Sequence, residues 1–291
     1  MPEELLYGRV RWVRDGAVAR IELASPDTRN ALDGDMTLGL REATARLAAG
    51  ADDGTLRVAV LTAQGPVFSV GGDLRWFAEA PDPSARIAET ATLLHETLHT
   101  LAQLPLPVVS VVHGTIAGGG IGIALGADIV LVGTAAKLRV AYTAAGLSPD
   151  CGVSWLLARR IGQARALDLA LTNRMVTAEE LGQWGLVSRV VAQETLADEA
   201  EEAVQTLASG SAPALAATKR LLREAGEPPT AFRTQLDAEA ASIADLLRGP
   251  DGREGLSAFL GKRAPVFMPP RERISPTHAT DLPDPASCHD R

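Results

Sequence analysis

Cysteine is scarce in this chain. Of its 291 residues only Cys151 and Cys288 are cysteines, and they lie far apart in dissimilar contexts. Two such residues provide neither the disulfide framework of a small secreted protein nor a Cys-x-x-Cys metal motif. The opening residues, MPEELLYGRVRW, are acidic at once and lack the apolar run of a signal peptide. Together these absences predict a cytoplasmic protein.

Concentrated positive charge is missing as well. The chain has 28 Lys and Arg against 36 Asp and Glu, a formal net charge of −8, and its cations are spread along the whole length. Binding to nucleic acid requires a concentrated basic surface that neutralises phosphates. The sequence therefore argues against nucleic acid as a partner, although a small ligand with a few phosphates needs only local cations.

The chain also lacks a long uninterrupted apolar helix. Between residues 97 and 136 the sole full charge is Asp128, but frequent glycines and the sequence LPLP interrupt this stretch. Helix and strand signals alternate within it, unlike the 20 or so apolar residues of a membrane-spanning helix. We expect no membrane segment. Aromatic residues are few, at 4%, which gives little support for a flat aryl-binding pocket.

Apolar residues are abundant, at 46% of the chain, so a sizeable core can form. In the first half, strand and helix patterns alternate, which predicts an α/β fold with parallel strands. A β-hairpin is expected over residues 8–23, turning at Asp15-Gly16. The remaining expected elements are helices at 31–50 and 84–103 and strands at 56–65, 108–113, 129–133 and 137–142.

From residue 154 onward the pattern is mostly helical. One short strand is expected at 187–191, and the expected helices cover 154–161, 163–172, 178–185, 193–209, 212–225 and 229–247. Residues 268–291 are rich in Pro, Ser, Asp and Arg without periodicity, which is typical of a disordered tail. The predicted organisation is a core over 1–200, a helical region over 201–267 and the tail.

Two glycine-rich turns stand out. GTIAGGGIGIALGAD (114–128) and SVGGDL (69–74) each place glycines at the end of an expected strand, just before a helix. The first is not a dinucleotide motif, because Gly126 comes one residue too late after Gly120 and Gly122, and no P-loop is present. Two such turns can aim backbone N–H groups at one point, as an enolate or tetrahedral oxyanion requires. The helix N-terminus adds positive potential.

Six segments in order give the chain a family resemblance. They are RNAL (29–32), FSVGGDL (68–74), HGTIAGGGIGIALGAD (113–128), AGLSPDCGVSWLLARRIG (145–162), AEELGQWGLVSRVV (178–191) and REGLSAFLGKR (253–263). The chain thus resembles the crotonase superfamily, also called the enoyl-CoA hydratase/isomerase family, over residues 7–267. The resemblance implies a ClpP/crotonase-like fold of repeated ββα units, with C-terminal helices that build homotrimers, often paired into hexamers.

The resemblance also implies a ligand, a CoA thioester, in which CoA is part of the substrate and no separate cofactor is needed. By position, the N–H groups of Gly72 and Gly119 would bind the thioester oxygen and stabilise an enolate. The resemblance further implies a set of residues that contact CoA, some of them across a subunit boundary: Ala31, Leu32, Gly71, Phe259 and Lys262.

The sequence departs from the hydratases of this family at two positions. Those enzymes use two glutamates, and Gly122 and Tyr142 stand here in their places. Adding water across a double bond needs one group to activate water and another to protonate carbon. Ordinary hydratase activity is therefore not expected.

A different carboxylate, Asp150, stands just before a helical run. The resemblance is greatest to enoyl-CoA isomerases of the phenylacetate ring-epoxide type, in which an Asp at this position moves a proton between carbons. In the similar chlorobenzoyl-CoA dehalogenases the equivalent Asp is a nucleophile, with an aromatic residue at the position of Tyr142 and a histidine at that of His95. Asp150, Tyr142 and His95 fit either chemistry. His95 and His99 share a helix face, but no Asp, Glu or Cys is spaced to complete a metal site.

The leading prediction is an enoyl-CoA isomerase in which Asp150 removes a proton from one carbon and returns it to another. Three alternatives remain open. They are a dehalogenase-like aryl-CoA enzyme with Asp150 as nucleophile and His95 activating water, a hydratase despite the missing glutamates, and a non-catalytic acyl-CoA binder.

Overall fold

The computed structural model of this chain describes residues 3–225 and 230–267. The predicted disordered tail at 268–291 lies outside the described residues. The strands are β1 (Glu3–Leu6), β2 (Val10–Asp15), β3 (Val18–Leu23), β4 (Val58–Ala63), β5 (Val67–Ser69), β6 (Val108–Val112), β7 (Thr115–Ala117), β8 (Ile129–Gly133), β9 (Lys137–Arg139), β10 (Val176–Thr177) and β11 (Arg189–Val191).

The helices are α1 (Gly34–Asp52), α2 (Leu74–Ala78), α3 (Pro83–Gln103), α4 (Gly119–Leu125), α5 (Val153–Thr172), α6 (Ala178–Gln183), α7 (Leu196–Ser209), α8 (Ala212–Glu224), α9 (Ala231–Arg248) and α10 (Pro250–Leu260). The break predicted between residues 161 and 163 is present, because Gly162 has non-helical angles inside α5. No helix within the described ranges is long and apolar enough to cross a membrane.

The strands of the described chain form two sheets. The larger has the order β1-β2-β3-β4-β6-β8-β11 and the smaller the order β10-β9-β7-β5. The pairs β3–β4, β4–β6, β6–β8 and β8–β11 are parallel, as predicted for the strands of the first half. The predicted hairpin is the antiparallel pair β2–β3, whose register ends with Asp15 opposite Val18.

The fold is built from repeated units of two strands and a helix. In the units β4-β5-α3, β6-β7-α4 and β8-β9-α5, the first strand joins the larger sheet and the second joins the smaller sheet. Of these second strands, β9 was predicted within 137–142, whereas β5 and β7, which run directly into the glycine-rich turns, were not predicted from the sequence. This ββα repetition is the architecture that the crotonase resemblance implies.

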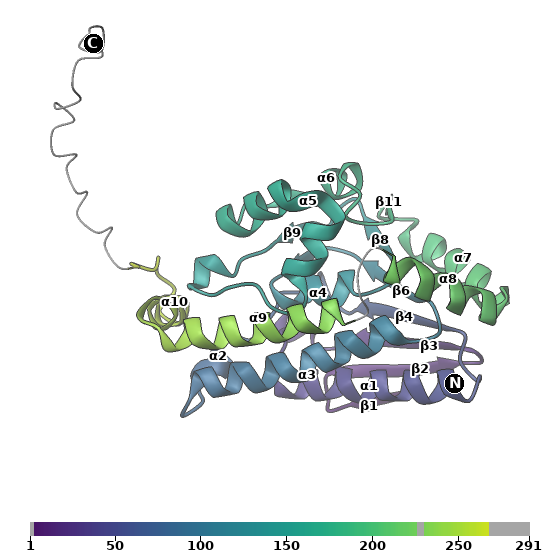
Figure 1. Cartoon of the computed structure of the whole chain (residues 1–291), viewed down its shortest axis with the longest axis horizontal. Coiled ribbons are helices and arrows are strands. Elements are labelled where there is room, and N and C mark those ends of the chain that lie inside the picture. Colours follow the sequence, from purple (N-terminus) through teal and green to yellow (C-terminus); the bar gives the residue numbers. More distant parts are fainter. Residues whose placement is uncertain (1–2, 226–229, 268–291) are drawn as a thin grey trace, which may run out of the picture.

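The larger sheet is covered on both faces. Its interior strand β6, VVSVV, is buried at every position, as expected for a parallel strand between two layers. One face packs mainly against α7, and the other packs into the main core with α1, α3 and α4. Figure 1 shows α7 and α8 at one end of the molecule, α10 at the other, and α3 and α9 side by side.

Candidate active site

A cavity of about 770 Å³ opens between the glycine-rich turns and the helices α3, α9 and α10. Seven of the residues singled out from the sequence line it: Ala31, Leu32, Gly72, Gly119, Tyr142, Asp150 and Phe259. Gly71, His95 and Lys262 are not among the lining residues. The cavity therefore unites candidates drawn from segments more than 200 residues apart.

The two glycine-rich turns touch one another. A Cβ added at Gly71, whose φ is +84°, would lie 3.0 Å from the amide nitrogen of Gly119 and 2.8 Å from the carbonyl oxygen of Ala117. Only glycine fits this backbone angle and this approach without strain. The predicted convergence of the turns is therefore present in the structure.

Both candidate amide donors belong to residues that line the cavity. Leu32 donates its N–H to the carbonyl of Gly71 and accepts from the N–H of Asp73, so the N–H of Gly72 points away from Leu32. Gly119 is the first residue of α4, and the N–H of a first helical residue has no acceptor inside its own helix. Asp73 caps α2 by accepting from the N–H groups of Arg75 and Trp76.

The glycines of α4 let a second segment pack directly on this short helix. A Cβ on Gly119 would lie 2.9 Å from Cys151 Sγ, and one on Gly122 would lie 1.8 Å from the carbonyl oxygen of Cys151. Gly119 and Gly122 are three residues apart and so share a helix face. The space that a glutamate side chain would need at position 122 is therefore filled by the backbone of Cys151.

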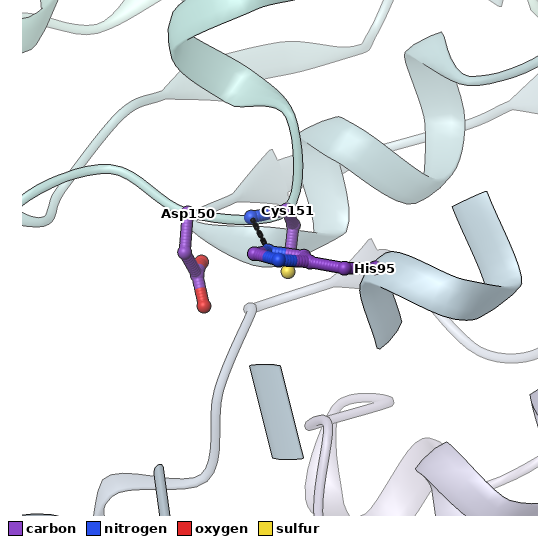
Figure 2. A group of neighbouring side chains, drawn as sticks. All are labelled: His95, Asp150 and Cys151. Atoms are coloured by element: carbon purple, nitrogen blue, oxygen red, sulfur yellow. Dashed lines mark hydrogen bonds between the residues drawn. The ribbon is translucent and has the colours of Figure 1, made fainter. Parts of the chain in front are cut away.

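The segment that packs there is the turn Asp150–Gly152, which we call the aspartate turn. Cys151 and Gly152 both have left-handed backbone angles, with φ values of 55° and 71°. The N–H of Cys151 donates to Nε2 of His95 at 3.0 Å, so that nitrogen carries a lone pair. Figure 2 shows the imidazole reaching from α3 to this backbone. Burial lowers the pKa of His95, which favours the neutral ring.

Asp150 presents a buried carboxylate to the cavity. The hydroxyl of Tyr142 donates to its Oδ1 at 2.5 Å and to its backbone carbonyl at 3.2 Å. Burial, with the neighbouring charge of Asp150, raises the pKa of Tyr142 well above its usual value. Tyr142 therefore remains a hydrogen-bond donor and is no base at neutral pH.

The tertiary structure brings together a cluster that the spacing of the sequence could not reveal. Ligand atoms of His95, Asp150 and Cys151 lie within 4.8 Å of one another. The donor set does not suit a metal ion, however. Nε2 of His95 already accepts from an amide, Oδ1 of Asp150 accepts from Tyr142, and burial raises the pKa of the Cys151 thiol well above its usual value.

One important residue of this region was missed from the sequence. Glu239 on α9 is 4% exposed, and its carboxylate accepts from the N–H groups of Gly152 and Ser154 at 2.7 and 3.1 Å. A signal was present, because Glu239 interrupts the apolar stripe of α9 formed by Leu236, Ile243 and Leu247. A charged residue in such a stripe indicates a buried partner.

The cavity has a polar and an apolar part. Exposed cationic side chains belong to the polar part: Arg29, Arg75, Arg139 and Arg263. The apolar part consists of side chains from α2, α3, α9 and the segment after β9: Phe77, Ile87, Ala91, Leu94, Leu147 and Ile243. Gly72, Gly119 and Asp150 also line the cavity. Such a site can hold a ligand with an anionic end and an apolar end.

Two stacked sheets of ββα units, with a cavity between paired glycine turns and C-terminal helices, define a crotonase-fold protein. The family model described as "Enoyl-CoA hydratase/isomerase" matches residues 14–270. The chain therefore belongs to the enoyl-CoA hydratase/isomerase family, the crotonase superfamily, as the six sequence segments indicated.

The individual relatives are named for different activities. The chain is 36% identical over 252 residues to a 1,2-epoxyphenylacetyl-CoA isomerase of Escherichia coli, covering 86% of this chain and 94% of that protein. It is 32% identical to a carnitinyl-CoA dehydratase of Salmonella typhi, covering 87% and 96%. Among solved structures, an enoyl-CoA hydratase from Mycobacterium avium subsp. paratuberculosis has a TM-score of 0.79 at 31% identity, covering 89% and 98%.

Proposed function

We propose that this protein is an enoyl-CoA isomerase in which Asp150 is the acid and base. The observation that carries the proposal is one buried carboxylate in the cavity beside the paired glycine turns, together with a filled space at Gly122. A family member at 36% identity carries the isomerase name, which adds support.

CoA would bind in the polar part of the cavity. Its phosphates are anions, and Arg29 and Arg75 are exposed cations that line this part. Ala31 and Leu32 line the same cavity, and the pantetheine chain would pass beside them. Phe259, 50% exposed on α10, offers an apolar surface to the same ligand.

The acyl group would occupy the apolar part, with its thioester oxygen accepting from the N–H groups of Gly72 and Gly119. Asp150 would remove a proton from one carbon, and the electron pair would pass into the thioester to form an enolate. The carboxylic acid would then return the proton to a carbon two positions away, which shifts the double bond. One carboxylate suffices, because the same group acts first as base and then as acid.

Hydration is a weaker candidate on steric grounds. The Cβ of a glutamate at position 122 would lie 1.8 Å from the carbonyl oxygen of Cys151, so this side chain does not fit there. Tyr142 at the other position donates its hydroxyl hydrogen to Asp150. Neither position 122 nor position 142 thus supplies the second acid–base group that water addition needs.

The dehalogenase-like alternative requires a histidine that activates water beside Asp150. His95 is 2% exposed, does not line the cavity, and accepts from the amide of Cys151. This geometry gives no support to that role. A non-catalytic acyl-CoA binder would use the same cavity and amides without needing a basic carboxylate.

The test is incubation of the protein with 3-enoyl-CoA and 2-enoyl-CoA substrates in D₂O. The isomerase is expected to move the double bond and to exchange protons at the two carbons. Binding of the thioesters with neither exchange nor migration would favour the binder. Hydroxyacyl-CoA formation would favour a hydratase, and chloride release from a chlorobenzoyl-CoA would favour the nucleophilic alternative.

We also propose that the protein assembles as a homotrimer or a homohexamer. Large apolar side chains are exposed on and just after α5 and on α8: Leu167, Leu171, Met175, Leu221 and Leu222. Burial of such side chains between copies is a common reason for their exposure in one chain. Sedimentation of the purified protein would give three or six copies if this holds, and one copy would contradict it.

A further inference from the structure

The aspartate turn is a strained segment that its own sequence does not hold in place. Cys151 is a non-glycine residue with a left-handed φ of 55°, a conformation that costs free energy and persists only where the surroundings enforce it. α5 begins just after the turn, and its N-cap residue Gly152 has no side chain with which to bind the first N–H groups. The turn therefore depends on residues from elsewhere in the chain.

Glu239 supplies that support from α9. Its Oε2 accepts from the N–H of Gly152 at 2.7 Å, and its Oε1 accepts from the N–H of Ser154 at 3.1 Å and from the Ser154 hydroxyl. Gln235, one turn earlier on α9, donates to the same hydroxyl at 2.7 Å. A carboxylate at a helix N-terminus is also favoured by the helix dipole. Glu239 thus acts as the N-terminal cap that α5 itself lacks.

We propose that Glu239 is a positioning residue that holds the aspartate turn in its strained conformation and thereby directs the Asp150 carboxylate into the cavity. The inference rests on the proposed role of Asp150. Glu239 does not line the cavity, so it acts through the backbone between Gly152 and Asp150. A small displacement of a reacting group is enough to lower a rate about 100-fold.

The hydrogen bonds from the backbone favour the ionised form of Glu239. The N–H groups of Gly152 and Ser154 can only donate, and a charged oxygen accepts from them more strongly than a protonated carboxyl, whereas the Ser154 hydroxyl can donate or accept. Burial, together with the charge of Asp150, raises the pKa of Glu239 to about 7, although the hydrogen bonds from Ser154 and Gly152 lower it. The carboxylate therefore loses its charge as the pH falls through about 7.

Other titratable and charged groups surround this cluster. Asp150 lies on the turn and His95 on α3, and Arg233 and Asp237 on α9 act on the pKa of His95. Burial lowers the pKa of His95, so His95 is neutral where Glu239 titrates. Below pH 7 we expect kcat to fall as Glu239 becomes protonated and the turn loosens.

The kinetic test compares Glu239→Gln with Asp245→Asn. Gln keeps the size of Glu but must place its NH₂ group against a backbone N–H. Asp245 is an exposed carboxylate on the same helix, so its substitution controls for loss of charge. For Glu239→Gln we expect kcat to fall about 10- to 100-fold, KM to stay within about twofold because the CoA contacts remain, and the acid limb near pH 7 to disappear. A kcat equal to that of Asp245→Asn would overturn the proposal.

A second variant covers the case in which Glu239→Gln does not fold. Ser154→Ala removes one of the three hydrogen bonds and leaves the carboxylate in place. We expect kcat to fall about threefold to tenfold with unchanged KM, the loss of one hydrogen bond to a charged group. An unchanged kcat in a folded Ser154→Ala enzyme would contradict the proposal, as would an equal change in kcat and in KM.

A third measurement does not depend on turnover. Cys151-Gly152 is the only Cys-Gly step in the sequence, so labelling with ¹³C-carbonyl cysteine and ¹⁵N-glycine gives a single correlated NMR signal for the Gly152 N–H. That signal should titrate near pH 7 in the natural protein and stop doing so in Glu239→Gln. If no thioester is isomerised, the proposed function fails but this titration still tests the bond. An active enzyme whose Gly152 signal does not titrate would refute the role of Glu239.

Discussion

Two aspartates, the half-buried Asp128 and the buried Asp150, each precede an element of the core and have opposite surroundings. Asp128, before β8, accepts from the N–H of Val108 and pairs with Lys219 at 2.8 Å and Arg223 at 2.7 Å. Asp150, before α5, accepts from the hydroxyl of Tyr142 and faces the cavity. The first carboxylate is neutralised by cations of α8 and has no oxygen left for a ligand. The second retains accepting capacity toward a substrate.

The difference separates a structural from a chemical use of the same side chain. Lys219 also donates to the carbonyls of Leu101 and Leu106, and Arg223 to that of Gly126, so Asp128 lies in a network that fastens α8 to the core. The carboxylate of Asp150 accepts instead from the hydroxyl of Tyr142, only eight residues earlier in the chain. Substitution at Asp128 should act on stability, and substitution at Asp150 on rate.

The largest effect is expected from Asp150→Asn. We expect kcat for double-bond migration to fall about 10³-fold, because an amide cannot take or return a proton. The melting temperature and the affinity for a CoA thioester should change little. Steady-state kinetics measures kcat, binding calorimetry measures the affinity and thermal denaturation measures the melting temperature. Asp168→Asn, on the exposed face of α5, is the control. Unfolding of Asp150→Asn, with undiminished activity in its folded fraction, would assign Asp150 a structural role like that of Asp128.

Asp128→Asn should give the opposite result. Lys219 is 8% exposed at its side chain, and removal of the partner of a buried cation is costly. We expect the free energy of unfolding to fall by about 3 kcal/mol, with kcat per folded molecule unchanged. Chemical denaturation and active-site titration together test this. A loss of kcat without loss of stability would erase the contrast between the two aspartates.

Gly122→Ala probes the packing that replaces the missing glutamate. Its Cβ would lie 1.8 Å from the carbonyl oxygen of Cys151, so α4 or the aspartate turn must move. We expect a loss of about 2–3 kcal/mol of stability and a lower kcat. Gly261→Ala, whose Cβ would come no closer than 3.3 Å to a neighbour, is the control and should cost much less. A Gly122→Ala protein as stable as this control would show that the aspartate turn can move aside without loss of stability.

Tyr142→Phe is expected to have the smallest effect. It removes one hydrogen bond to the carboxylate of Asp150 and leaves the cavity otherwise unchanged. Loss of one bond to a charged group, about 1.4 kcal/mol, corresponds to about a tenfold lower kcat. Measuring kcat for Tyr142→Phe and for Asp150→Asn under the same conditions gives the ratio of the two losses. A loss as large as that of Asp150→Asn would make Tyr142 a direct participant in proton transfer.

Much of the site could be predicted from local patterns. Gly71 and Gly119 stand at the ends of short strands before helices, and such turns have a recognisable composition. Asp73 precedes α2 and caps it, and an aspartate just before a helix is a recognisable N-cap. The strands β4, β6 and β8 of the larger sheet were recognisable because their residues form continuous apolar runs. The strands β1, β5 and β7 were not predicted, and β5 and β7 run directly into glycine-rich turns that hide so short a strand.

Glu239 was missed for another physical reason. Its function depends on donors 85 and 87 residues away, and no periodicity within α9 indicates which backbone it will meet. His95 was named because its position matches that of a histidine in the dehalogenases that the chain resembles, but its role depends on the direction of its ring, which meets the amide of Cys151.

The sequence by itself determined the family, the paired glycine turns and the absence of both hydratase glutamates, because these are properties of residue type and order. Only the tertiary structure decided why Gly122 must be glycine, which aspartate is neutralised and which faces the cavity, and what holds the aspartate turn. Those outcomes depend on contacts between segments distant in the chain, and the energy of such contacts depends on distance and burial, which are set only when the helices and sheets have packed.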